Sequence, residues 1–254
     1  MPEGDTIFRA ARTLHAALAG RAVTRFVSMF PALLRTPLEG RTVEGVHAAG
    51  KHLLIDFSGG LTLRTHMRMN GSWHLYRSGE RWRRPRDEMR IVIETGAYVA
   101  VAFLVPVAEL LDQRALERQP ELRALGPDIL APEFDAAAVL PRVRERDGEE
   151  IANILLNQRV VAGIGNIWKS ESLFAAKVNP FRKAAELDDA TLIAVLTAAR
   201  KLMRASASPD GRPRFNVYSR GGQPCRRCGT AIAYRKQGLD ARGTYWCTKC
   251  QGDQ

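Results

Sequence analysis

Apolar residues follow a helical period at the start of the chain. Ile7, Ala11, Leu14 and Leu18 are separated by four, three and four positions, so they fall on one face of a helix. Gly20 comes soon after this pattern, and glycine is common just past the end of a helix. The chain is therefore expected to open with an amphipathic helix.

The period changes to that of short strands between residues 23 and 103. Over 61–67, Leu61, Leu63 and Met67 alternate with polar residues and share one face. The segments 90–94 and 98–103 flank Thr95-Gly96, which is typical of a hairpin turn. Several short strands at this spacing predict an antiparallel β-sandwich.

Helical patterns replace the strands after about residue 107. They cover the segments 109–118, 135–146, 149–157, 166–177 and 188–204. Gly126-Pro127 marks a boundary, and 205–214 has the composition of a loop. The predicted class is α+β, with a leading helix and β-sandwich domain over 1–125, a helical domain over 126–214 and a cysteine-containing β-hairpin over 215–254.

All four cysteines lie near the C-terminus, in two C-x2-C pairs: Cys225, Cys228, Cys247 and Cys250. The 18 residues between the pairs fit a four-cysteine zinc site, in which each pair supplies two thiolates. The segments 230–234 and 244–246 predict the strands between them. Disulfide bonds are the alternative, but cytosolic thiols stay reduced and the N-terminus does not resemble a secretory signal. One structural Zn²⁺ is therefore expected.

The overall composition is that of a folded, basic protein. Among 254 residues, 38 Lys and Arg oppose 27 Asp and Glu, so the formal net charge is +11. Only seven of these cations are Lys, and Arg is the better bidentate ligand of phosphate. The balance favours a nucleic-acid partner, although a GC-rich genome would also enrich Arg. No apolar stretch is long enough to span a bilayer, so we expect no membrane partner and a cytoplasmic location.

Pro2 and Glu3 are candidates for chemistry at the N-terminus. Methionine before proline is commonly removed, which would expose a secondary amine. Since an α-amino pKa is about 7.7–8.0, roughly 10–20% of such an amine is neutral and nucleophilic at pH 7. Glu3 beside it can donate a proton to a leaving or ring oxygen. The alternative is an ordinary helix start, where proline and acidic residues are common.

A second candidate is the run Gly163-Ile164-Gly165-Asn166, which precedes the predicted helix at 166–177. Two glycines allow a sharp turn, and Asn166 is expected to cap the helix. Open amides at the helix start, together with the Asn166 side chain, would form a seat for a phosphate. An ordinary glycine turn between two helices is the alternative.

Taken together, these motifs resemble the formamidopyrimidine-DNA glycosylase and endonuclease VIII family. The matching stretches are Met-Pro-Glu-Gly-Asp-Thr at 1–6, Gly-Lys-His at 50–52, His-Met-Arg-Met-Asn-Gly at 66–71, residues 158–166, and Asn-Val-Tyr at 216–218 before the cysteines. The resemblance implies a two-layered β-sandwich, a helix–two-turns–helix domain and a zinc finger. It also implies a DNA repair enzyme that acts on damaged DNA as a monomer, in a bacterial cytoplasm and associated with the nucleoid.

The resemblance assigns catalysis to three residues. Pro2 would attack C1′ of the damaged nucleoside and expel the base, and the resulting iminium would allow strand cleavage by β,δ-elimination. Glu3 would protonate the opening sugar ring, and Lys51 would contact a phosphate near the damage and assist catalysis.

Five further residues are candidates for DNA contacts. Asn166 and Arg242 match a phosphate clamp, which would offset the few kcal/mol needed to extrude a nucleotide. Met69, beside Arg68, is the candidate apolar wedge, with core packing at a strand end as its alternative. His66 either contacts phosphate or is an ordinary residue of the sheet.

Two features place the chain nearer the pyrimidine branch of the family than the 8-oxoguanine branch. It opens with Pro-Glu-Gly-Asp-Thr, and it has Val-Ala-Val-Ala-Phe-Leu at 99–104 in place of the purine branch's Asp-Pro-Arg-Arg-Phe-Gly. However, Arg68-Met69-Asn70 departs from the Gln-Leu-Tyr wedge of the pyrimidine branch. Oxidised pyrimidines are the expected substrates. The alternatives are a purine-lesion glycosylase and a non-catalytic zinc-dependent DNA-binding protein.

Overall fold

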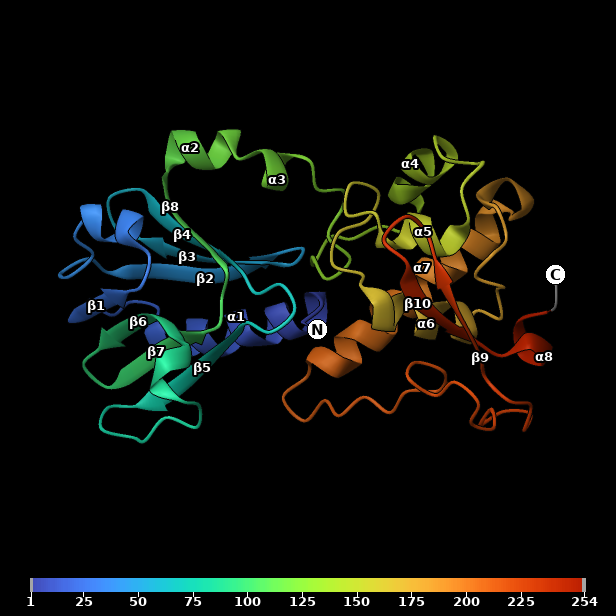
Figure 1. Cartoon of the computed structure of the whole chain (residues 1–254). Helices are drawn as coiled ribbons and strands as arrows, with labels where there is room; N and C mark the ends of the chain where they lie inside the picture. The colour runs from blue at the N-terminus through green and yellow to red at the C-terminus, as the bar shows by residue number, and fades with distance from the viewer. Residues whose placement is uncertain (1, 253–254) are drawn as a thin grey trace. The chain divides into compact units, whose positions relative to one another are not determined.

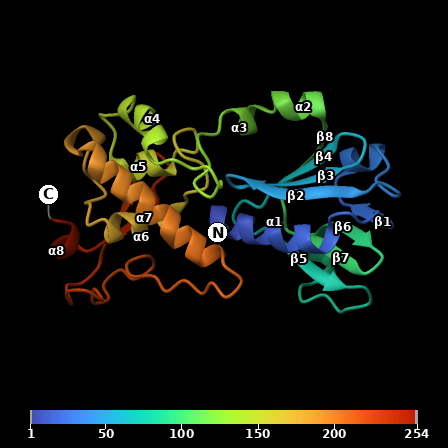
Figure 2. The ribbon, with the colours of Figure 1, turned by 180° about the vertical axis from the view of Figure 1, so that it is seen from behind.

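The computed structural model describes residues 2–252, so the expected loss of Met1 lies outside the described residues. The chain divides into two compact units (Figure 1 and Figure 2). Unit 1 consists of Met1–Pro2 and Thr6–Arg123, and unit 2 of Glu3–Asp5 and Ala124–Gln254. The first helix, α1 (Gly4–Leu18), therefore begins with residues of unit 2 and continues in unit 1.

Unit 1 contains two antiparallel sheets of four strands each, in the orders β1-β6-β7-β5 and β2-β3-β4-β8. The strands are β1 (Arg25–Ser28), β2 (Val43–Ala49), β3 (His52–Phe57), β4 (Leu61–His66), β5 (Ser72–Arg77), β6 (Met89–Thr95), β7 (Tyr98–Phe103) and β8 (Val107–Asp112). Two 3-10 turns, η1 (Pro31–Arg35) and η2 (Arg86–Glu88), and the helices α2 (Gln113–Arg118) and α3 (Pro120–Arg123) complete the unit.

Both sheets bury side chains in one apolar core, which confirms the predicted sandwich. Ile55 of β3 and Ile93 of β6 belong to the same buried cluster. The helix α1 adds its predicted apolar face to this cluster: Ile7, Ala11, Leu14 and Leu18. Full burial of a leucine or isoleucine contributes roughly 1.5–3 kcal/mol, so this face attaches α1 to the sandwich.

The predicted hairpin at Thr95-Gly96 is also confirmed. Thr95 of β6 pairs with Tyr98 of β7, so Gly96 and Ala97 form a two-residue turn. Gly96 has φ of +47°, a left-handed conformation that glycine adopts without steric strain.

The prediction of a helix over 109–118 is wrong at its start. Residues up to Asp112 form β8, which pairs with β4 and places Leu110 opposite Leu63. The strand is partly buried along most of its length, so its sequence lacks the alternation of a half-exposed strand. The helix α2 begins only after Asp112, whose side chain accepts a hydrogen bond from Ala115 N at 2.7 Å.

Unit 2 is helical up to about residue 207, as expected. Its helices are α4 (Leu140–Arg144), α5 (Ile151–Leu156), α6 (Asn166–Ala175) and α7 (Asp189–Ala207), with 3-10 turns η3 (Ala137–Val139) and η4 (Ala184–Glu186). The helices α6 and α7 pack against each other (Figure 2). No helix within residues 2–252 combines the length and the apolarity needed to cross a membrane.

The C-terminal segment, residues 222–252, forms a structure that we call the cysteine hairpin. It consists of β9 (Ala233–Gln237), β10 (Arg242–Trp246) and the short helix α8 (Thr248–Gln251). The first strand begins three residues later than the start predicted at Thr230. The backbone of Thr230 and Ile232 instead bonds to the segment around the first cysteine: the Thr230 carbonyl accepts a hydrogen bond from Cys225 N, and Ile232 N donates to the Gln223 carbonyl.

A buried arginine joins the second sheet of unit 1 to α3. The side chain of Arg64 is only 2% exposed, and its Nε lies 3.0 Å from a carboxylate oxygen of Glu109. Its Nη1 lies 2.7 Å from a carboxylate oxygen of Glu121 in α3 and 3.0 Å from Nδ1 of His52. Because a guanidinium only donates hydrogen bonds, His52 accepts at Nδ1 in this contact.

The same surroundings keep His52 neutral. Burial, followed by the neighbouring His66, Arg64 and Arg68, lowers the pKa of His52 to about 3. Protonation would also place a second cation against Arg64 without a counterion of its own.

We expect unit 1 to lose stability as the pH falls from 7 to 5. The unfolded chain protonates His52 near pH 6.5, whereas the folded chain protonates it only near pH 3, so the unfolded state binds more protons across this interval. The stabilisation is complete above pH 6.5 and decreases toward pH 3. At pH 5 the loss from His52 is about 2 kcal/mol, measurable by urea unfolding.

The substitution His52→Gln should flatten this dependence, since glutamine does not titrate and its amide oxygen can still accept from Arg64. His47→Gln is the matched control, because His47 is more than half exposed, and this variant should keep the wild-type slope. Parallel pH curves for wild type and His52→Gln would contradict the assignment.

Candidate functional site

The carboxylate of Glu3 lies on the first turn of α6. Its Oε1 accepts a hydrogen bond from Ile167 N at 2.8 Å, and its Oε2 accepts one from Trp168 N at 3.3 Å. Glu3 is only 1% exposed. Amides at a helix start are otherwise unsatisfied and carry the positive end of the helix dipole, so they favour a carboxylate at this position.

Three glycines allow the chain to approach so closely. Gly4 N donates to the Gly163 carbonyl at 2.9 Å, and a Cβ on Gly4 would lie 2.8 Å from Cα of Gly163. A Cβ on Gly165 would lie 2.3 Å from the carboxylate carbon of Glu3. Gly163 itself has φ of +101°. The glycines of the motif are thus required by the docked N-terminal segment.

Two expectations for this motif are wrong. The amides at the start of α6 are not an open phosphate seat, because Glu3 accepts their hydrogen bonds. Asn166 does not cap the helix either: the capping residue is Gly165, and Asn166 is the first helical residue. A carboxylate from a distant segment does what a local side chain was expected to do.

The N-terminal segment has a further anchor in unit 2. Ser206 Oγ of α7 donates to Asp5 Oδ2 at 2.6 Å. Pro2 directly precedes this anchored segment and is partly buried. Its backbone is therefore tied, through one peptide bond, to a fixed glutamate.

Asn166 lies between α6 and the cysteine hairpin. Its Nδ2 donates to the Gly243 carbonyl of β10 at 2.8 Å, and its Oδ1 accepts from Lys169 Nζ at 2.7 Å. Lys169 Nζ also donates to Thr244 Oγ1 at 2.8 Å. No spacing rule predicts this lysine, because two of its partners lie more than seventy residues away; its position one turn after Asn166 is the only signal in the sequence.

Arg242 is the first residue of β10, next to Gly243. Its side chain is 42% exposed, and Nε lies 3.9 Å from Asp240 Oδ2 in the turn. Asn166 therefore reaches the hairpin backbone one residue away from Arg242. The structure brings these two predicted clamp residues to the same region of unit 2.

In unit 1, Lys51 lies in the turn between β2 and β3, and His66 ends β4. Burial is the main cause that lowers the pKa of His66 to about 4, and Arg68 and Lys51 are among the cations that contribute to this shift. The His66 ring meets His52 edge-on at 4.8 Å and accepts a hydrogen bond from Arg68 N at 3.0 Å. The histidine thus has local partners within the sheet and its loop.

The loop that follows His66 exposes Met69. This side chain is 56% exposed, so the core-packing alternative for Met69 is wrong. Gly71 N closes the loop on the Met67 carbonyl at 2.9 Å, and Arg68 has φ of +50°. A tight turn therefore presents an apolar side chain to the surroundings of unit 1.

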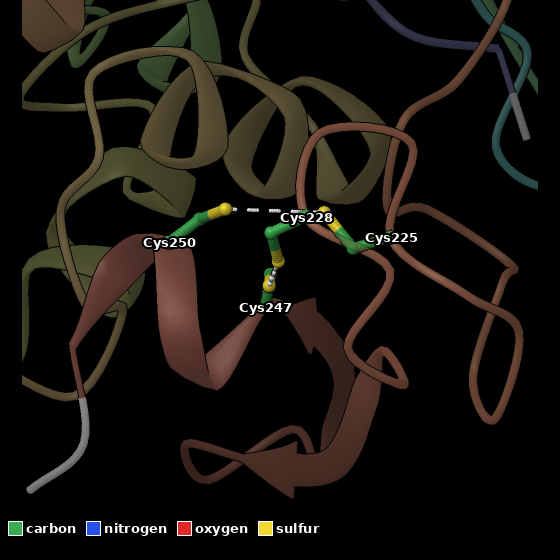
Figure 3. A group of neighbouring side chains, drawn as sticks. All are labelled: Cys225, Cys228, Cys247 and Cys250. Carbon is green, nitrogen blue, oxygen red and sulfur yellow. Dashed lines mark hydrogen bonds between the residues drawn. The ribbon is translucent and has the colours of Figure 1, made fainter.

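The four cysteines converge in the cysteine hairpin (Figure 3). Their sulfur atoms all lie within 4.8 Å of one another, with 3.9 Å between Cys225 and Cys250 and 3.4 Å between Cys228 and Cys247. Zn–S bonds of about 2.3 Å in a tetrahedron place sulfurs about 3.8 Å apart. The arrangement therefore fits a four-thiolate metal site.

The predicted site residues fall into two sets. Unit 1 contains Pro2, Lys51, His66, Arg68 and Met69, and unit 2 contains Glu3, Asn166, Arg242, Cys225, Cys228, Cys247 and Cys250. Within unit 2, Glu3 and Asn166 meet at the start of α6, and Asn166 reaches the strand of Arg242. Within unit 1, the charge of Lys51 is felt at His66.

Three domain families match the chain. The formamidopyrimidine-DNA glycosylase N-terminal domain matches residues 1–104, and the formamidopyrimidine-DNA glycosylase H2TH domain matches residues 125–213. The zinc finger found in FPG and IleRS matches residues 222–252.

Several endonuclease 8 and lyase relatives align with nearly the whole chain. A probable endonuclease 8 2 of Streptomyces coelicolor is 40% identical over 99% of this chain and 94% of its own length. Endonuclease 8 of Escherichia coli is 34% identical over 99% of this chain and 100% of its own. The DNA-(apurinic or apyrimidinic site) lyase Nei2 of Mycolicibacterium smegmatis is also 34% identical, over 99% of both chains.

Among solved structures, Lactococcus lactis formamidopyrimidine DNA glycosylase bound to DNA with an AP site has a similar fold. The TM-score is 0.85, over 99% of this chain and 100% of that one. At 21% sequence identity, this likeness concerns the fold.

Replacing Gly165 with alanine is expected to detach Glu3 from α6. The new methyl group would overlap the carboxylate, and overpacking of this kind costs about 1–3 kcal/mol. The amide signals of Ile167 and Trp168 should shift, and the thermal midpoint should fall.

Gly148→Ala is the matched control, since a Cβ on Gly148 meets nothing within 4 Å, and it should leave both readouts near wild type. Unchanged Ile167 and Trp168 amides in Gly165→Ala would contradict the role assigned to Glu3.

Chelating metal ions away from the four cysteines is expected to unfold the cysteine hairpin. Metal binding supplies about 10–16 kcal/mol to small zinc domains, more than this hairpin can gain from its own burial. Amide signals of residues 222–252 should collapse toward unfolded positions, those of the β-sandwich should persist, and added Zn²⁺ should restore the first set. Native hairpin signals in chelated, metal-free protein would refute metal-dependent folding.

Proposed function

The chain belongs to the formamidopyrimidine-DNA glycosylase and endonuclease 8 family, and we propose that it is a DNA glycosylase with DNA-(apurinic or apyrimidinic site) lyase activity, acting in base excision repair. One observation carries the proposal: Pro2 immediately precedes a glutamate whose carboxylate is fixed on the start of α6. The names of the relatives, endonuclease 8 and DNA lyase, agree with it.

In the proposed reaction, the secondary amine of Pro2 is the nucleophile once Met1 has been removed. Its nitrogen adds to C1′ of the damaged nucleoside as the base departs with the bonding electrons. The proline nitrogen then gives up its proton to the Glu3 carboxylate, and opening of the sugar ring, whose oxygen receives that proton, leaves an iminium between the proline nitrogen and C1′. The iminium acidifies the C2′ proton, and successive β- and δ-eliminations release the phosphates on both sides of the lesion.

Glu3 is the proposed proton donor to the sugar ring oxygen as the ring opens. Its two hydrogen bonds to α6 amides fix the carboxyl group one residue from the nucleophile. The carboxyl group therefore needs little reorientation during the reaction. The entropy cost of ordering the Glu3 side chain is therefore part of the free energy of folding and does not add to the reaction barrier.

Phosphate binding is assigned to Lys51, Asn166 and Arg242. Extruding a nucleotide from the duplex costs a few kcal/mol of stacking and pairing, which contacts to the flanking phosphates offset. Arg242 is supported by its exposed guanidinium and Asn166 by its position at the base of the cysteine hairpin.

Met69 is the proposed wedge that fills the space left by the extruded nucleotide. Its exposure at the tip of a closed turn supports this role. Arg68 in the same turn and His66 at its base are proposed to contact the adjacent DNA backbone.

Oxidised pyrimidines are the proposed substrates. The segment 99–104, where the purine branch has its intercalating residues, is here mostly the buried strand β7. It therefore has no exposed pair of side chains to match that wedge. The Pro-Glu-Gly-Asp-Thr opening and the endonuclease 8 relatives point in the same direction.

One structural Zn²⁺ in the cysteine hairpin completes the proposal, with Cys225, Cys228, Cys247 and Cys250 as ligands. The enzyme is proposed to act as a monomer on damaged DNA in the bacterial cytoplasm, at the nucleoid. Its named relatives are bacterial proteins.

Borohydride reduction should trap the wild-type chain on DNA that contains an abasic site, since it converts the iminium to a stable amine. Pro2→Gly should reduce trapping at least about tenfold, because glycine supplies a primary amine without the ring that presents the proline nitrogen, while binding persists. The same assay on duplexes with thymine glycol, 5-hydroxycytosine or 8-oxoguanine ranks the lesions.

Mass spectrometry must first show that Met1 is absent. If the processed wild type binds DNA but forms no adduct, the chain is a DNA-binding protein without the chemistry. Undiminished trapping by Pro2→Gly would instead make a lysine, such as Lys51, the nucleophile. Preferential excision of 8-oxoguanine opposite cytosine would overturn the pyrimidine assignment.

A further inference from the structure

A buried lysine on α6 has no role in the proposed chemistry. Lys169 is only 1% exposed and lies within unit 2, against the cysteine hairpin. A buried ammonium group is costly unless oxygen atoms replace its lost water. The oxygen atoms around the Lys169 ammonium group must therefore replace its lost water.

The ammonium group has three oxygen partners from two elements. The closest are Asn166 Oδ1 at 2.7 Å and Thr244 Oγ1 at 2.8 Å, and the Gly243 carbonyl lies at 3.4 Å. An ammonium group has three N–H donors, so this set satisfies it. None of these partners is a carboxylate, and the positive charge is not neutralised by them.

A chain of hydrogen bonds continues from Thr244 into both strands of the hairpin. Thr244 Oγ1 donates to Gln237 Oε1 at 2.7 Å, and Gln237 Nε2 donates to Glu150 Oε2 at 2.7 Å and to the Pro180 carbonyl at 3.1 Å. Because Lys169 can only donate, the Thr244 hydroxyl must accept from it and donate onward. The direction of every bond is thus set by the lysine.

The same logic fixes the carboxamide of Asn166. Lys169 must face its oxygen, so its nitrogen faces the Gly243 carbonyl, where it donates at 2.8 Å. A reversed amide would place NH₂ against NH₃⁺ and oxygen against a carbonyl, so one orientation is enforced.

Three charged or titratable groups influence this lysine or its amide partner. Burial lowers the pKa of Lys169 to about 8, with Glu3 opposing the shift and Arg242 adding to it. Tyr218 faces Asn166, and burial raises its pKa, so it is neutral at pH 7. Most Lys169 side chains therefore carry a proton at neutral pH.

We propose that Lys169 is a positioning residue for DNA phosphate: it holds the Asn166 carboxamide in one orientation against β10, so that Asn166 and Arg242 present their donors as one rigid unit. The proposal rests on the proposed function only in taking Asn166 and Arg242 as phosphate ligands. It assigns Lys169 no contact with DNA and no step of the chemistry.

A double-mutant cycle tests the proposal. The variants are Asn166→Ala, Lys169→Met and the two combined, and the probe is a duplex with one tetrahydrofuran abasic-site analogue, which cannot form the iminium. If Lys169 acts through Asn166, each single variant should weaken binding about tenfold or more, and the double variant should bind within about twofold of Asn166→Ala. Fluorescence anisotropy over a range of KCl concentrations gives the Kd values.

Two further variants separate positioning from charge and from folding. Lys201→Met removes an exposed lysine of α7 and should bind within about twofold of wild type. Lys169→Arg keeps the donors and the charge, so it should retain most of the affinity. The side-chain amide signal of Asn166 should move in Lys169→Met and stay near its wild-type position in Lys169→Arg.

Thermal midpoint and zinc content are measured for every variant. If Lys169→Met unfolds, Lys169→Gln replaces it in the cycle, since glutamine keeps a donor but no charge. Wild-type affinity in the folded lysine variant, or losses that multiply in the double variant, would overturn the proposal. Because the probe undergoes no reaction, this result is independent of borohydride trapping, and either test can fail alone.

Discussion

The carboxylate of Glu3 on the first turn of α6 is the contact on which the candidate site of unit 2 depends. It satisfies amides that a helix start leaves unpaired, and it does so from a segment more than 160 residues away in sequence. The requirement for glycine at 4 and 165 follows from the space that this carboxylate and its neighbouring backbone occupy. This hydrogen-bonded contact thus accounts for glycine at both positions by geometry, and it sets the position of the residue before Glu3, the proposed nucleophile.

Arg64 and Lys169, the two buried cationic side chains within residues 2–252, are held in different ways. Arg64 lies against two partly exposed carboxylates, which compensate its charge and connect sheet and helix. Lys169 bonds only neutral oxygens, so its charge continues to act on its surroundings, among them Glu3 and Arg242. The first arrangement suits a structural tie. The second leaves a positive charge within unit 2 that none of its hydrogen-bond partners neutralises. A net charge of +11 describes neither arrangement.

The features predictable from sequence are those whose cause is local. The apolar face of α1, the turn at Gly96 and the paired cysteines each depend on residues within a few positions of one another. The strand β8 escaped prediction because partial burial along most of its length removes the alternation that identifies a strand. The sequence does not predict that Glu3 accepts from the α6 amides, or which residues bind Lys169, for a different reason. Both are contacts between distant segments, and the residue types involved have ordinary local explanations.

The pairing of β9 with β10 places Gln237 opposite Arg242 and Arg235 opposite Thr244. Arg242 and Thr244 are two positions apart, so they share one face of the strand. A slip of one residue would turn both to the other face and separate the hydroxyl from Lys169. The turn of four residues, 238–241, fixes this alignment by its length. Leu239 and Asp240 in this turn are exposed. Gly238, by contrast, has φ of +71°, and a Cβ there would lie 2.6 Å from Asn153 Oδ1. A single insertion or deletion would misalign everything beyond the turn. The length of this turn is therefore more tightly constrained than the identity of its exposed side chains.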